Sequence, residues 1–358
     1  MAGSVYGTVF RIMTWGESHG KGVGVTIDGC PAGLALCEED IQTYLDRRRP
    51  GQSRYTTARS ESDQVEILSG VFEGRTTGTP IAMIVRNMDQ RSRDYSAIMD
   101  VYRPGHADYG FDSKYGFRDY RGGGRSSGRE TIARVAAGAV ACRLLAQYGI
   151  TVTAYVKSIG VFEVQSARFD LAERDRNPLA MPDPVAAAEA SDFLERMMAE
   201  HDSAGGVVEC LVDGMPAGVG EPVFDKLDAC LAKAVMSIGA VKGFEIGDGF
   251  AAAEARGSEN NDSFYTDGDG KVKKRTNHSG GILGGISDGS QIVLRAAFKP
   301  TPSIARDQQT VNRMGENVQI AIRGRHDPVI VPRAAVVVEA MTALTIADLL
   351  LMNRSAKI

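Results

Sequence analysis

The helix-like and strand-like runs of this sequence do not alternate at the spacing of βαβ units, which argues against a doubly wound parallel sheet. No Pro- or Ser-rich linker divides the 358 residues, so we predict one α+β domain spanning residues 1–358. Predicted helices cover residues 38–48, 130–148, 184–200, 221–236 and 332–352. Predicted strands cover residues 22–27, 81–85, 151–159, 207–213 and 291–298. The polar stretch 256–281 is predicted to be mobile.

Cysteine usage and apolar runs bear on the cellular compartment. The five cysteines form no CxxC pair, which argues against a disulfide framework or a zinc site and favours buried, reduced thiols. The first ten residues do not have the composition of a signal peptide. No apolar run approaches the roughly 20 residues that span a bilayer. We therefore expect a cytoplasmic protein without membrane contact.

Arginine is used unevenly along the chain. Residues 1–134 hold 16 Arg and two Lys, whereas the remainder holds 14 Arg and nine Lys. Arginine binds carboxylate and phosphate groups bidentately, and a net charge of −4 argues against a nucleic-acid partner. We therefore predict a pocket for a small anion, with structural ion pairs as the alternative. The run 47–51, which contains Arg48, exceeds what capping of a helix C-terminus requires.

Two turns carry histidines that can transfer protons near neutral pH. Residues 16–20, the His19 turn, read Gly-Glu-Ser-His-Gly. Residues 103–108, the His106 turn, place Arg103 close enough to hold an anion beside the imidazole, which would then protonate a departing phosphate oxygen. The alternative is that both histidines are structural, with His106 paired to Asp108.

Residues 122–130, the glycine loop, read Gly-Gly-Gly-Arg-Ser-Ser-Gly-Arg-Glu. Ser127 and Glu130 match the S-x-x-E capping box, so a helix should begin here and offer its N-terminal N–H groups to a phosphate. The loop is neither a Walker A motif nor a GxGxxG fingerprint, which argues against a nucleoside triphosphate or a Rossmann-bound dinucleotide. The alternative is a plain capped helix.

Further turns follow at residues 236–243, 280–285, 299–303 and 324–328. A flat cofactor held by backbone groups would suit such turns, as would ordinary loops. Asp327 is a candidate base.

In this order, the GESHG, RRRPGQSR, RPGHAD, GGGRSSGRE, KPTPS and GRHDP segments resemble those of the chorismate synthase family over nearly the whole chain. The resemblance implies conversion of 5-enolpyruvylshikimate 3-phosphate to chorismate. This anti-1,4-elimination removes phosphate and one C6 hydrogen at the last step of the shikimate pathway. It also implies a requirement for reduced FMN, which gives an electron to the substrate transiently, and a homotetramer whose fold is a β-α-β sandwich of two antiparallel sheets flanked by helices.

The resemblance also assigns residues by position. His19 and His106 would be the acids, one for the phosphate and one for the flavin, with the assignment between them left open. Asp327 would act with the flavin in removing the C6 hydrogen, and Ser18 and Ser127 would support proton transfer. The FMN contacts would be Arg125, Ser126, Ser127, Gly239, Ala240, Gly284, Lys299, Pro300, Thr301, Pro302, Ser303 and Arg325. The substrate or NADP contacts would be Arg48, Arg49, Arg54, Arg103 and Arg129.

Two positions depart from the family pattern. Gly239 stands where relatives often have Asn, and Gly128 stands where Ala is common. Two alternative functions remain: an NADPH-dependent flavin reductase, and a non-catalytic flavin- or phosphosugar-binding module. The absence of a dinucleotide fingerprint argues against the first, so an external flavin reductant is expected. The two histidines and Asp327 argue against the second.

Overall fold

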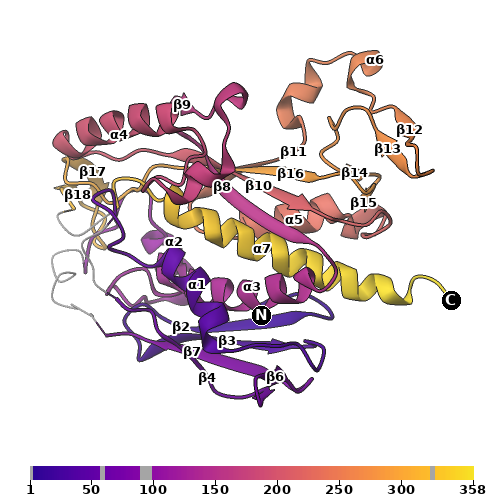
Figure 1. The fold of residues 1–358 in the computed structure, drawn as a ribbon. Coiled ribbons are helices and arrows are strands. Elements are labelled where there is room, and N and C mark those ends of the chain that lie inside the picture. The colour runs from indigo at the N-terminus through magenta and orange to yellow at the C-terminus, as the bar shows by residue number, and fades with distance from the viewer. Residues whose placement is uncertain (1–2, 57–60, 89–98, 323–326) are drawn as a thin grey trace.

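The computed structural model describes residues 3–56, 61–88, 99–322 and 327–358, and contains two five-stranded antiparallel sheets (Figure 1). The first sheet has the strand order β1 (Val5–Tyr6), β2 (Arg11–Gly16), β3 (Gly22–Asp28), β7 (Ile81–Arg86) and β4 (Val65–Ile67). The second has the order β11 (Val241–Ile246), β16 (Ile292–Phe298), β10 (Gly206–Asp213), β8 (Thr151–Ile159) and β9 (Phe162–Glu163). Side chains of β7 and β16 alternate between buried and partly exposed, as expected where one face of a sheet lies on the core.

Two long helices lie between the sheets (Figure 1). Helix α3 (Thr131–Ala146) packs on β2, β3 and β7 of the first sheet, and α7 (Val331–Met352) packs on β8 and β10 of the second. The two helices also pack against each other, so one continuous buried cluster runs from Phe10 to Leu350. The other α-helices of the described residues are α1 (Glu38–Arg48), α2 (Asp108–Tyr115), α4 (Pro184–Ala199), α5 (Leu227–Met236) and α6 (Gly257–Asn260).

Short hairpins complete the described chain. They are β5 (Val71–Phe72) with β6 (Arg75–Thr76), β12 (Phe264–Thr266) with β13 (Val272–Lys274), β14 (Ile282–Leu283) with β15 (Ile286–Ser287), and β17 (Gln308–Val311) with β18 (Asn317–Ile320). An α+β fold with antiparallel sheets is therefore confirmed.

Helix α7 corrects one expectation. Among the described residues, the helical stretch 331–355 is long and apolar enough to cross a membrane by length and composition, although the sequence suggested that no run approaches that length. Its most apolar window is 83% buried inside the protein, which identifies α7 as a core helix. Its two buried carboxylates have partners: Glu339 pairs with Arg47, and Asp348 accepts the backbone N–H groups of residues 8–10.

Most predicted element bounds are confirmed within two residues. Helix α5 is an exception, because a 3₁₀ turn precedes it and the helix begins six residues later than predicted. Helices α2 and α6 and strands β2 and β11 were not predicted. Cys37 is exposed at the start of α1, contrary to the expectation of buried thiols, although all five cysteines are free.

Residues 256–281 are held by a buried lysine. Lys274 Nζ lies 3.0 Å from Asp262 Oδ2 and 2.7 Å from Asp288 Oδ2, and it also donates to Asn277 and Ser279. Its side chain is only 2% exposed. A buried ion-pair network therefore connects residues within this stretch to Asp288, while the predicted mobility of residues 256–281 stays a prediction.

Candidate active site

The His19 turn connects β2 to β3, and its two functional side chains are buried. Ser18 Oγ lies 3.2 Å from His19 Nδ1, so the hydroxyl and the imidazole are hydrogen-bonded, with the tautomer of the ring deciding which group donates. The turn is narrow because β2 and β3 are directly paired from Gly16↔Val23 onward. The sheet therefore fixes His19 at one end of a strand pair.

The His106 turn precedes α2 and is organised by an ion pair. Arg103 donates from Nε to Asp108 Oδ2 and from Nη2 to Asp108 Oδ1, each at 2.7 Å, and both side chains are buried. Asp108 therefore pairs with Arg103, and the alternative that pairs it with His106 is wrong. His106 instead lies 3.0 Å from Pro104 O through Nδ1 and 2.9 Å from Ser303 Oγ through Nε2.

Burial and the neighbouring Arg103 guanidinium lower the pKa of His106 to about 4. Both effects disfavour the imidazolium, so the ring is neutral at pH 7. A bound anion next to the ring would oppose these effects and raise the pKa.

Gly122 joins the two histidine turns. A Cβ at this position would lie 2.9 Å from His19 Cε1 and 3.0 Å from Ser18 Oγ, so only glycine allows this approach. The Gly122 carbonyl accepts a hydrogen bond from Arg103 Nη2 at 3.1 Å. The glycine loop, the His19 turn and the His106 turn therefore meet at Gly122.

The glycine loop forms two consecutive 3₁₀ turns, and α3 follows at Thr131. Ser127 caps the second turn by accepting from Arg129 N at 3.3 Å. The predicted capping box is wrong in its other half, because the Glu130 carboxylate binds Thr14 and Arg134 instead of the Ser127 backbone. The Ser126 hydroxyl donates to Gly123 O at 2.7 Å.

Arg125 reaches across to the first sheet. Its guanidinium donates to Gly16 O at 3.0 Å and to Thr14 Oγ1 at 2.6 Å, and this ties the glycine loop to β2. A cavity of about 320 Å³ lies beside the loop. Residues 122–126 of the loop line it together with three aromatic residues from α2 and the following turn: Phe111, Tyr115 and Phe117.

The predicted anion-binding arginines fall into two groups. Arg49 and Arg54 are exposed and pair with Asp46 and Glu195. Arg48, Arg103 and Arg129 are buried, and each has a protein carboxylate as its partner. Their roles toward substrate or NADP stay predictions.

Asp63 was not predicted, yet it holds two of these arginines. Its Oδ2 lies 2.5 Å from Arg48 Nη2 and its Oδ1 lies 3.1 Å from Arg129 Nη2. Asp63 and Arg48 are each 1% exposed, and desolvation lowers the pKa of Arg48 to about 10. The only signal in the sequence was a pair of carboxylates, Glu61 and Asp63, shortly after the arginine run.

The segment 299–303 packs directly on the His106 turn. Lys299 Nζ donates to Gly105 O at 2.6 Å, and Lys299 N donates to Ala240 O at 3.0 Å. Ala240 has a φ of +72°, which is strained for a residue with a side chain. The Thr301 hydroxyl oxygen is buried without a hydrogen-bond partner among the residues that the structure describes. These groups form a polar surface on which the Thr301 hydroxyl could still form a hydrogen bond to a ligand.

Gly284, Asp327 and Gly239 are further predicted site residues that the structure describes. Gly284 occupies the β14–β15 turn, whose neighbour Gly285 accepts a hydrogen bond from Leu227 at the start of α5. Asp327 accepts from Arg333 Nη1 at 2.6 Å. Arg325 lies outside the described residues. At Gly239, a Cβ would meet nothing within 4 Å, so the Asn found in relatives would fit.

Comparison with known proteins gives one consistent result. A family model described as chorismate synthase matches residues 10–351. A chorismate synthase from Lachnospira eligens is 65% identical, with 100% of this chain and 97% of the relative covered; one from Methanosarcina mazei is 58% identical, with 99% and 97% covered. A solved structure titled "Crystal Structure of Chorismate Synthase" superposes with a TM-score of 0.78 at 34% identity, covering 98% of this chain and 94% of that one.

Proposed function

Because this chain belongs to the chorismate synthase family, it is a phosphate-eliminating lyase of the shikimate pathway, and we propose that its two histidine turns carry out the proton transfers of that reaction. The observation that carries the proposal is Gly122, where the His19 turn and the His106 turn meet the glycine loop. The substrate, 5-enolpyruvylshikimate 3-phosphate, bears one phosphate and two carboxylates.

The elimination breaks two bonds and makes one π bond. The C6–H bond breaks and its electrons form a new π bond, the existing ring π bond shifts to complete the diene, and the C3–O bond breaks with its electron pair leaving on the phosphate oxygen. The C6 hydrogen and the phosphate are both lost, so the substrate undergoes no net oxidation. The protein must therefore supply a proton to the phosphate and accept one from C6.

His106 is suited to the first task. It is neutral in the free protein, and a phosphate dianion placed beside it would raise its pKa and let it bind the proton that it then donates. Ser303 orients the ring through Nε2, and Pro104 O through Nδ1. We propose His19, with Ser18 beside it, as the second acid, and Asp327 as the group that acts in removal of the C6 hydrogen.

The family resemblance implies reduced FMN, and the residues present fit such a group. A ligand with a phosphate and a polar ring edge could bind the Thr301 hydroxyl, which has no hydrogen-bond partner among the described residues. The Lys299 ammonium group and the serines of the glycine loop could also bind such a ligand. When bound, reduced FMN would supply an electron transiently to the substrate. We propose that Arg125 to Ser127, Gly239, Ala240, Gly284, Arg325 and Lys299 to Ser303 hold it.

The remaining expectations are also proposals. We propose that residues 1–358 form a single catalytic domain with the family's β-α-β sandwich, and that it acts as a homotetramer in the cytoplasm. We favour an external flavin reductant over an NADP site, because the sequence carries no dinucleotide fingerprint. Substrate anions are the proposed ligands of Arg48, Arg49, Arg54, Arg103 and Arg129.

An anaerobic assay with dithionite-reduced FMN tests the proposal by following phosphate release and chorismate absorbance. The wild-type protein should release one phosphate per substrate. His106→Ala should lower kcat on the order of 10²- to 10⁴-fold, the range for loss of a general acid. His278→Asn is the control, since His278 pairs with Asp248 near β12 and β13. Absence of phosphate release from the wild type, or full turnover by His106→Ala, would contradict the proposal.

A further inference from the structure

We propose that Arg333 is a positioning residue for Asp327, an inference that rests on the proposed function of Asp327 in removing the C6 hydrogen. Arg333 Nη1 donates to Asp327 Oδ2 at 2.6 Å, and Arg333 Nε donates to the backbone carbonyl of Arg48 at 2.8 Å. One guanidinium thus connects the predicted base to the C-terminal end of α1.

The guanidinium group is suited to this connection because it is planar and rigid. Its two donors bind two oxygens from different segments in a fixed geometry, which a lysine ammonium does not provide. The Arg333 and Asp327 side chains are 18% and 13% exposed, so both are largely shielded from water. The backbone that follows Asp327 is held separately, since Pro328 O accepts a hydrogen bond from Ala204 N at 2.9 Å. Arg333 therefore acts on the orientation of the carboxylate itself.

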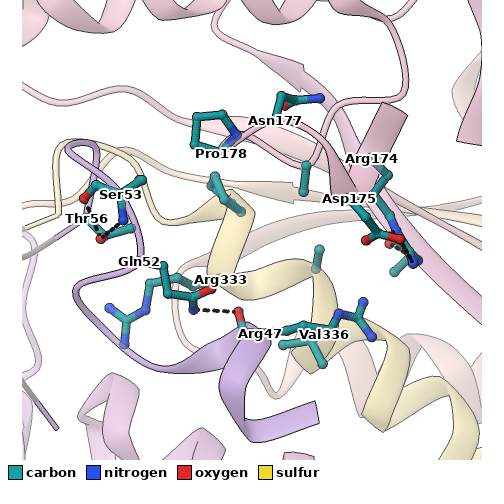
Figure 2. Close-up of a pocket in the computed structure, with 14 residues that line it drawn as sticks. Arg47, Gln52, Ser53, Thr56, Arg174, Asp175, Asn177, Pro178, Arg333 and Val336 are labelled. Carbon is teal, nitrogen blue, oxygen red and sulfur yellow. Dashed lines mark hydrogen bonds and ion pairs between the residues drawn. The ribbon is translucent and has the colours of Figure 1, made fainter. Parts of the chain in front are cut away.

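Arg333 lies in the first turn of α7 and lines a cavity of about 210 Å³ (Figure 2). Figure 2 shows Arg333 beside Gln52, with Arg47 along the same side of the cavity and Asn177 and Pro178 opposite. Gln52 donates to Arg47 O at 2.9 Å and to Arg49 O at 2.7 Å. Arg333 and Gln52 thus bind the carbonyls of three consecutive residues and fix the end of α1 against which Asp327 is held.

Arg47 offers a matched control. It also bridges α1 and α7 at this cavity, donating from Nη1 and Nη2 to the two Glu339 oxygens at 2.7 and 3.0 Å. Its carboxylate partner is Glu339 and not Asp327. Replacing either Arg47 or Arg333 should therefore weaken the contact between α1 and α7, whereas only replacing Arg333 should misplace Asp327.

The experiment compares Arg333→Gln and Arg47→Gln with the wild type, using reduced FMN and substrate carrying hydrogen or deuterium at C6. We expect Arg333→Gln to lower kcat about 10-fold, as when a group that orients a functional ligand is removed. We also expect its C6 deuterium isotope effect to exceed that of the wild type, because hydrogen removal becomes more rate-limiting. KM should change less than about twofold, since uniform substrate binding is retained. Arg47→Gln should lower the melting temperature and leave the isotope effect unchanged.

Three outcomes would overturn the inference: a folded Arg333→Gln protein with wild-type kcat and isotope effect, a loss confined to KM, or an equal rise of the isotope effect in Arg47→Gln. Should Arg333→Gln fail to fold, Arg333→Lys, which keeps the charge and one donor, is measured in its place with the same expectations. If the wild type itself releases no phosphate, the proposed function fails, and that result is distinct from a failure of the Arg333 assignment.

Discussion

Asp63 sets the charge balance of the buried arginines. One carboxylate contacts guanidinium groups from α1 and from the glycine loop, and Glu61 lies 3.6 Å from Arg129 as a second anion. Two positive and two negative groups therefore share a region that water hardly reaches, where unpaired charges would cost several kcal/mol each. Arg48 and Arg129 thus hold the glycine loop in place before any ligand binds, with Arg48 Nη1 donating to Gly128 O.

The His106 titration gives a prediction at this scale. Histidine NMR of the free protein, with His106→Asn for assignment, should place the His106 pKa near 4, below its ordinary 6.5. The unfolded chain then binds more protons between these values, so stability falls as pH drops from about 6.5 to about 4. Substrate added without FMN should raise the pKa. A midpoint near 6.5 in the free protein would contradict this expectation.

At this scale the sequence predicts candidate reactive residues but does not indicate their partners. Ser18, His19, His106 and the glycine loop stand in short motifs whose chemistry is local. In the structure, Gly122 of the loop lies against Ser18 and His19 and accepts from Arg103 of the His106 turn. The pairing of Arg103 with Asp108, and of Arg48 with Asp63, depends on how the chain turns between them. A charge pattern alone does not distinguish an arginine that awaits a ligand from one that already has a carboxylate.

At the scale of the elements, α3 and α7 cross at a very short backbone distance, at Gly138 of α3 and Ala340 of α7. A Cβ on Gly138 of α3 would lie 2.3 Å from Ala340 Cβ and 2.5 Å from Ala340 Cα. Such distances require one helix to move. The small residues therefore bring the backbones together, and with them the two sheets on which the helices pack.

Replacing Gly138 by Ala should lower stability, although alanine favours helix by about 1 kcal/mol over glycine. Overpacking of a close contact costs about 1–3 kcal/mol, and Ala340→Gly in the same chain should restore part of the loss. Gly128→Ala is the control, because a Cβ there meets nothing within 4 Å and φ is not positive. It should gain roughly 0.5–1 kcal/mol. Urea denaturation measures all four proteins; equal effects of both glycine substitutions would contradict the steric explanation.

Element types were well predicted where periodicity is strong, as in α1, α3, α7, β8 and β16. The missed elements have weaker local signals. Helix α2 includes a glycine at position 110, and β2 has the mixed composition of a strand near the edge of its sheet. The ion pairs of Lys274 with Asp262 and Asp288 join residues that are separated along the chain, which no local pattern could indicate.

At the scale of the whole molecule, the buried cluster includes residues of both sheets and of the helices between them. Neither sheet has a separate core, so we predict a single cooperative unfolding transition. Trp15, the one tryptophan of the sequence, lies on β2 and reports the first sheet. Its fluorescence and the far-UV circular dichroism should follow the same urea curve at a fixed protein concentration. A fluorescence midpoint at lower urea would show that the first sheet unfolds separately.

The central position of α7 has a consequence for the growing chain on the ribosome. All strands of the first sheet have been synthesised once residue 86 is reached. Helix α7, which completes the shared core, spans residues 331–352 and is synthesised much later. At a translation rate of roughly 5–20 residues per second, the apolar face of the first sheet stays incompletely buried for on the order of tens of seconds. Premature release or ribosome stalling before this helix emerges would therefore yield an aggregation-prone fragment, and chaperone capture during synthesis would protect it.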